Sequence, residues 1–212
     1  MRRATLVFAV LATLLFISSC SNPASDKPKA VTNDAAPVAP SAPSPAAKGE
    51  KYLITTENSK IQFQASKVTG SHHGSFEKFS GAIDYTGKVE TSGVTINIET
   101  ASVKTDTPDL TKHLQTPDFF DVAKFPTATF TSTEIKPSSG INQNYTVTGN
   151  LQLHGVTKSI TFPATITVAA NTITVESIFS INRKDFGINY AGAADNLIRD
   201  EVVMELHVKA TK

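Results

Sequence analysis

This chain of 212 residues contains five histidines. Histidine is the side chain best suited to act at neutral pH as a metal ligand or as a general acid or base. His72 and His73 are adjacent, and neighbouring residues of an extended segment point to opposite faces, so the pair is poorly placed to chelate one metal ion. His113 falls in an expected helix, whereas His154 and His207 fall on the polar faces of expected strands. None has the close spacing of a structural zinc site or a zincin helix. The histidines therefore predict no metal site.

Nucleophiles and paired carboxylates give an equally weak catalytic signal. The chain has no G-x-S-x-G motif, and its single cysteine, Cys20, closes an N-terminal apolar segment. Asp118 and Asp121 could form a catalytic carboxylate pair, but their positions are typical of residues at a helix start. We therefore predict no enzymatic activity. A hydrolase or metal-assisted enzyme that uses His154 or His72 is the least favoured hypothesis.

A signal sequence explains Cys20 better than catalysis does. Arg2 and Arg3 precede an apolar run from Leu6 to Ile17, which is shorter than the about 20 apolar residues that a transmembrane helix needs. The Ser-Ser-Cys that follows resembles a bacterial lipobox, in which the cysteine is acylated and becomes the first residue of the mature protein. We predict a lipoprotein signal peptide over residues 1–19. An ordinary secretory signal with a coincidental cysteine is the alternative.

Acylation of Cys20 would tether the protein to a membrane, because several acyl chains anchor a protein stably where one is marginal. Ser21 follows in place of the aspartate that resembles an inner-membrane retention signal, which favours the outer membrane, facing the periplasm. Residues 20–50 are rich in Ala, Pro and Ser and contain no aromatic residue, a composition typical of a disordered linker. We expect this linker to hold the folded domain clear of the membrane.

Composition bounds the remaining function classes. With 40% hydrophobic and 18% charged residues, the chain suits a soluble globular protein with one folded domain, here residues 51–212. Loss of Arg2 and Arg3 would leave 18 of the 20 basic residues against 19 acidic ones. Nucleic-acid binders carry clustered basic residues, so this balance argues against nucleic acid as a partner.

Alternation of apolar and polar residues predicts strands over most of the domain. The clearest pair lies between Asn144 and Val168, where two long alternating runs are joined by a short turn. The other runs lie near residues 61–65, 70–85 (with a bend), 94–98, 127–133, 172–181 and 201–209. About eight long strands with one apolar face predict an all-β, lipocalin-like, eight-stranded antiparallel barrel, with a two-sheet sandwich as the alternative.

One segment breaks the alternation. Thr107-Pro108-Asp109 and Thr116-Pro117-Asp118 each place a capping hydroxyl before a proline and an acidic residue, which is a helix-start pattern. We predict a short helical insertion of two helices over residues 108–124, packed over one end of the sheet.

The apolar faces of the strands supply the candidate interior. Their large side chains either fill a dry core or surround a cavity, and periodicity alone does not separate these outcomes. The inward positions are Phe63, Phe76, Ile96, Phe130, Leu151, Leu153 and Phe162.

Four segments resemble a known family. They are residues 113–126 (HLQTPDFFDVAKFP), 149–158 (GNLQLHGVTK), 76–83 with its Phe-Ser-Gly, and 183–187 (RKDFG), which occur in the family's order. These motifs resemble the YceI-like, polyisoprenoid-binding family. The resemblance implies a secreted, lipocalin-like barrel whose elongated apolar cavity holds an isoprenoid chain, and it adds Phe119 and Phe120 to the expected pocket wall. Residues 53–59 and 67–74 depart from the pattern, which leaves the head-group preference undefined.

These expectations combine into a non-catalytic, membrane-tethered binding protein of the cell envelope. Its expected partner is an isoprenoid-type lipid or prenyl quinone, and no other cofactor is expected. A dry barrel that serves as a scaffold for partner proteins is the alternative. The sequence predicts neither the oligomeric state nor the identity of the lipid.

Overall fold

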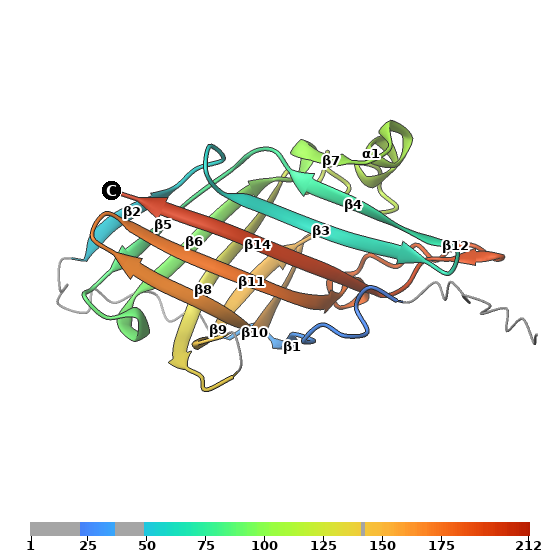
Figure 1. The fold of residues 1–212 in the computed structure, drawn as a ribbon. Coiled ribbons are helices and arrows are strands. Elements are labelled where there is room, and N and C mark those ends of the chain that lie inside the picture. Colours follow the sequence, from blue (N-terminus) through green and yellow to red (C-terminus); the bar gives the residue numbers. More distant parts are fainter. Residues whose placement is uncertain (1–21, 37–48, 141–142) are drawn as a thin grey trace, which may run out of the picture.

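Eight long antiparallel strands close into a barrel in which neighbours in space follow the order of the chain (Figure 1). The computed structural model describes residues 22–36, 49–140 and 143–212. Three of the eight strands are interrupted and consist of two parts. In order they are β2 (Glu50–Ile54) with β3 (Lys60–Lys67), β4 (Gly70–Phe76) with β5 (Phe79–Tyr85), β6 (Gly93–Glu99) with β7 (Val103–Thr105), β8 (Thr127–Pro137), β9 (Tyr145–Leu153), β10 (Val156–Ala169), β11 (Thr172–Asn182) and β14 (Glu201–Thr211).

The last strand closes the ring. β14 pairs with β11 along one edge and with β3 and β2 along the other, through Val203–His207 and Thr211. Each closed edge removes a row of unpaired backbone groups. The eight-stranded antiparallel barrel expected from the alternation is confirmed.

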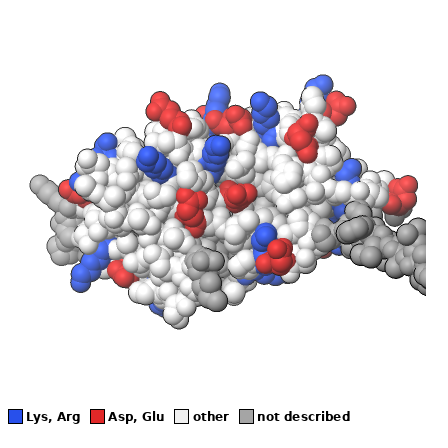
Figure 2. Space-filling view, viewed as in Figure 1, with Lys and Arg blue, Asp and Glu red and all other residues white. Residues whose placement is uncertain are grey.

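Side-chain alternation along each strand divides the barrel into an inside and an outside. On β14, Met204, Leu206 and Val208 face the interior, whereas Glu205 and His207 are exposed on the outer surface. On the face shown in Figure 2, basic and acidic side chains are interspersed, without a patch of one sign. That face does not have the clustered basic charge that nucleic-acid binding requires.

The expected bend within residues 70–85 falls at Glu77 and Lys78, between β4 and β5. Their backbone N–H groups donate to Ser102, at the carbonyl (3.1 Å) and the hydroxyl (3.0 Å) respectively. Ser102 ends the 3-10 helix η2 (Thr100–Ser102), which interrupts the next strand at the same level. The two breaks are therefore hydrogen-bonded to each other, which keeps the paired strands in register.

The helical insertion is shorter than predicted. α1 spans Pro108–Leu114, but residues 115–124 form successive turns, and the second predicted helix is absent from them. Asp121 adopts a left-handed backbone conformation (φ 44°), which a right-handed helix cannot contain. α1, the β9–β10 turn and the small hairpin of β12 (Gly192–Ala193) and β13 (Asn196–Leu197) lie at one end of the barrel, here called the α1 end (Figure 1). No helix in the described ranges is long and apolar enough to cross a membrane.

An N-terminal strand completes the wall between β10 and β11. These two strands pair only from Thr165 to Ala169 on β10, and their ladder stops next to Pro163, which has no N–H to donate. In the gap that follows, β1 (Val31–Asp34) pairs with residues 158–161 of β10. Ser180 of β11 bonds the same segment, donating to Pro28 and accepting from Ala30, both at 2.8 Å. The structure thus differs from the expected disordered linker: residues 22–36 are packed against the barrel, although their Ala/Pro/Ser composition gave no sign of it.

Asn150 fastens the end of this segment. It faces outward on β9, yet it is buried, because residues 34–36 pass over it. Its side-chain amide donates to the carbonyl of Ala36 (2.9 Å) and accepts from the N–H of Ala36 (3.1 Å). The asparagine side chain therefore makes, with Ala36, the two hydrogen bonds that a residue of a neighbouring strand would otherwise make.

Replacement of Asn150 by alanine is expected to loosen the N-terminal segment while the barrel stays folded. The loss of two hydrogen bonds in a buried site should cost about 1–2 kcal/mol and speed amide exchange over residues 30–36. Hydrogen–deuterium exchange with peptide-level resolution measures this directly. Gln152→Ala, at an exposed position of the same strand, is the matched control. Unchanged exchange in the Asn150→Ala protein would contradict the assigned role.

Candidate functional site

The interior of the barrel contains two adjoining apolar spaces. The first, here called the central chamber, has a cavity volume of about 100 Å³; the second, the α1 chamber, lies under α1 and has a volume of about 120 Å³. Each is smaller than a typical small-molecule pocket, which has about 300–1,000 Å³. The described residues present only apolar atoms to either chamber. The two chambers adjoin and are together called the cavity, because four residues line both: Ile98, Leu151, Ile181 and Met204.

Inward side chains do not fill this cavity. Phe130, Leu151 and Met204 point into it, and each is only partly buried. A close-packed protein interior has few voids larger than a water molecule, so partial burial on the inside of a closed wall indicates open space. The same holds for Val94, Ile98, Leu153, Val175, Val202 and Leu206.

All nine residues predicted as pocket wall line the cavity. The central chamber is lined by Ile96, Phe130 and Phe162, and Leu151 lies between the chambers. The α1 chamber is lined by Phe63, Phe76, Phe119, Phe120 and Leu153. That these side chains contact a bound lipid stays a prediction.

Two glycines keep aromatic rings against the wall. Gly74 lies opposite Phe63 across β3 and β4, and a Cβ at Gly74 would stand only 2.2 Å from the Phe63 ring. A Cβ at Gly149 would likewise stand 2.4 Å from the ring of Phe130. Because these positions have no side chain, both rings lie along the backbone instead of projecting across the lumen. Sequence reasoning missed this arrangement, although a glycine within an alternating strand is a signal for it.

Turns and aromatic side chains close the α1 end. Leu114, Phe119, Phe120 and Ile188 cover the α1 chamber, and the Phe76 and Phe120 rings meet at 5.6 Å. These residues belong to the expected insertion and to the loop after β11, so the cover is made of loops on a rigid wall. At the opposite end, the rings of Tyr52 and Tyr85 pack edge to face at 6.1 Å.

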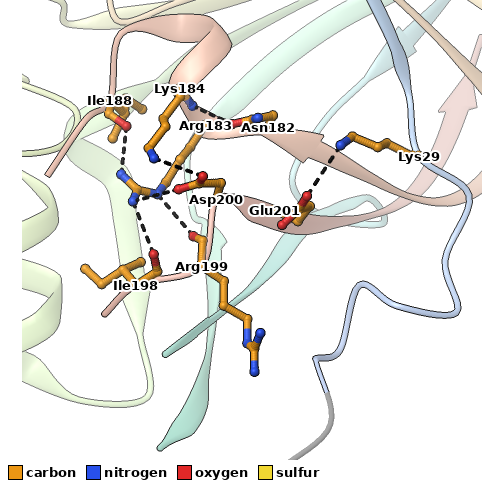
Figure 3. Close-up of polar contacts among 9 residues, drawn as sticks. All are labelled: Lys29, Asn182, Arg183, Lys184, Ile188, Ile198, Arg199, Asp200 and Glu201. Carbon is orange, nitrogen blue, oxygen red and sulfur yellow. Dashed lines mark hydrogen bonds and ion pairs between the residues drawn. The ribbon is translucent and has the colours of Figure 1, made fainter. Parts of the chain in front are cut away.

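Arg183 fixes the loop that completes the α1 end (Figure 3). It belongs to the 3-10 helix η3 (Arg183–Phe186), its side chain is 5% exposed, and it lines the α1 chamber. Its guanidinium donates to the carbonyls of Ile188 (2.7 Å), Arg199 (3.1 Å) and Ile198 (3.4 Å). Burial lowers the pKa of Arg183, and the carboxylate of Asp200, at 3.3 Å, opposes that shift. The sequence contained this residue in a family motif but did not reveal its four acceptors.

The histidines have structural contacts. His72 and His113 contact Asp106 (2.9 Å) and Asp118 (2.8 Å), respectively. His154, with a left-handed φ of 52°, contacts the carbonyl of Phe186 at 3.3 Å and packs on the Phe125 ring. Within the described ranges, no group of three or more His, Cys, Asp or Glu residues is arranged to hold a metal ion. Cys20 lies outside the described residues.

Loss of Arg183 is expected to destabilise the α1 end. Arg183→Met leaves three carbonyls without this donor and removes one of the two cationic partners of Asp200, which should lower the free energy of unfolding by about 3 kcal/mol. Lys184→Met is the control, because Lys184 contacts the same Asp200 (2.9 Å) from a half-exposed position and should cost less than about 1 kcal/mol. Urea unfolding of both variants measures the difference, and equal losses would contradict the role of Arg183.

Comparison with known proteins identifies similar chains. The family model for the YceI-like domain matches residues 52–210. A UPF0312 protein of Vibrio cholerae is 32% identical over 177 residues, covering 79% of this chain and 90% of the relative. One from Pseudomonas putida is 34% identical over 140 residues, covering 63% of this chain and 72% of the relative.

Solved structures share the fold. BcnA from Burkholderia cenocepacia superposes with a TM-score of 0.67 at 26% identity, over 74% of this chain and 99% of BcnA. A domain from Saccharophagus degradans, described as polyisoprenoid-binding and implicated in plant cell wall breakdown, gives a TM-score of 0.61 at 20% identity, over 77% of this chain and 98% of that domain. At this identity, the second likeness shows the fold alone.

Proposed function

The chain belongs to the YceI-like domain family, and from that premise we propose that it holds an isoprenoid or similar long apolar lipid inside its barrel, without catalysis. The observation that carries this proposal is the cavity, whose described walls present only apolar atoms. The polyisoprenoid-binding description of the Saccharophagus degradans domain supports the same ligand class. A prenyl quinone is a second ligand of that class.

The walls favour an uncharged chain over a charged head group. Each buried methylene contributes about 0.8 kcal/mol before the cost of ordering the ligand. The only charged residue along the two chambers, within the described ranges, is Arg183, and its donors already face protein acceptors. An ionised head group placed deep in the cavity would find no free partner there, so the chain occupies the interior and the head group stays near an end.

A substitution that fills the cavity distinguishes the lipid-carrier hypothesis from the dry-scaffold hypothesis. Leu151 lies where the chambers join, so Leu151→Trp should reduce binding of a prenyl quinone at least tenfold by occupying the space. Equilibrium titration of the delipidated protein measures this. Thermal stability should be retained or increased, because the added ring enters an empty volume.

Gln152→Trp is the matched control, since it adds the same ring to the outer side of β9 and should leave binding unchanged. If the interior were a dry core, Leu151→Trp would instead overpack it and destabilise the protein by about 1–3 kcal/mol. That outcome, together with no quinone binding by the unsubstituted protein, would contradict the carrier and favour the scaffold hypothesis.

We also propose that Cys20 is acylated and tethers the protein to the envelope, in the outer membrane facing the periplasm. The support is the order of features in residues 1–20: a positively charged start, then an apolar run, then Ser-Ser-Cys.

Cys20→Ser should move the protein from the membrane fraction to the soluble fraction, whereas Ser21→Ala should leave it membrane-bound. Fractionation followed by mass measurement of the N-terminal peptide tests this. A Cys20→Ser protein that still sediments with membranes would contradict the tether.

A further inference from the structure

Three exposed apolar residues gather at the α1 end. They are Val68 (45% exposed), Tyr190 (36%) and Leu197 (48%), here called the apolar tip. Val68, in the β3–β4 turn, donates its N–H to the carbonyl of Leu197 on β13 (3.2 Å). Thr69 and Asn196 join the same two turns through their side chains at 2.7 Å. The two turns therefore form one unit that presents Val68 and Leu197 together.

Tyr190 links this unit to the cover of the cavity. Its ring lies 5.1 Å from that of His113 on α1 and 5.4 Å from that of Phe119, which lines the α1 chamber. A tyrosine with an apolar ring and a polar hydroxyl suits the boundary between lipid and water. The apolar tip thus borders the cover of the α1 chamber.

The N-terminal segment leads to the same end. Lys29 bonds Glu201 at the start of β14 (3.4 Å; Figure 3). In Figure 1, the dark blue start of the described ribbon lies on the same side of the barrel as the start of β14. Residues 22–25 form a closed turn, and Ala24 is buried. Two peptide units separate Cys20 from Asn22, so their α-carbons are at most about 7 Å apart. A lipid on Cys20 therefore enters its membrane next to this end of the barrel.

We propose that the barrel docks on the surface of the membrane to which Cys20 is anchored, with Val68, Tyr190 and Leu197 among the lipid head groups. This inference rests on the proposed function. Asp195, in the β12–β13 turn, and Lys67 flank the tip, so docking is shallow and suits a zwitterionic surface. The cover of the α1 chamber then faces the bilayer, so a lipid chain that passes this cover does not cross bulk water.

The absence of tryptophan from the chain allows a direct test. Leu197→Trp and Leu53→Trp each give a single fluorescent reporter, and Leu53 is a matched control because it is 52% exposed and pairs with Thr211 near the opposite end. The acylated full-length protein is reconstituted in phosphatidylcholine vesicles with or without bromine on the acyl chains. Bromine should quench the tryptophan at position 197 and leave that at position 53 unchanged.

The outcomes are distinguishable. Protein that floats with the vesicles but shows no quenching at position 197 overturns the docking and leaves the tether intact. Protein that does not float overturns the tether of the proposed function, and the docking with it.

A second pair of variants tests the consequence for transfer. Val68→Ser combined with Leu197→Ser should slow prenyl quinone transfer from donor vesicles severalfold, with quinone binding in solution unchanged. Leu53→Ser should transfer at the unsubstituted rate. Equal transfer by all three proteins overturns the docking, whereas no quinone binding by any of them overturns the proposed lipid carrier itself.

Discussion

The structure depends on one constraint: eight antiparallel strands close around an interior that is just wide enough either to be filled by side chains or to hold one ligand. Here the inward residues are large, so small differences in ring placement decide between the two. Gly74 and Gly149 let the rings of Phe63 and Phe130 lie along the wall. Unfilled apolar space therefore remains in the lumen beside the buried core.

Closure of that wall involves segments far apart in the chain. Pro163 ends the β10–β11 ladder, and β1 fills the gap that follows. At the α1 end, Arg183 donates hydrogen bonds to three backbone carbonyls and so fixes the loop that completes the cover. The N-terminal segment is thereby part of the barrel, which places any anchor on Cys20 close to the wall instead of at the end of a long tether.

The sequence predicted the strands and seven inward residues because alternation is a local property, and the family resemblance added Phe119 and Phe120. All nine line the cavity. What it missed depends on distant partners. The Ala- and Pro-rich composition of residues 20–50 conceals β1, since a strand needs only backbone groups to fill a gap whose position the local sequence does not show. The helix-start pattern at Thr116 predicted a second helix, but the backbone at Asp121 is left-handed and the segment forms turns instead. Cavity volume follows from contacts across the barrel, as between Gly149 and Phe130, which periodicity does not encode.

Native mass spectrometry of the protein purified without detergent tests the central claim most directly, because it weighs whatever the cavity holds. The account predicts a complex whose extra mass is released as an apolar, isoprenoid-type lipid on organic extraction. A protein that always has its bare mass, and that takes up no prenyl quinone when one is supplied, would contradict it.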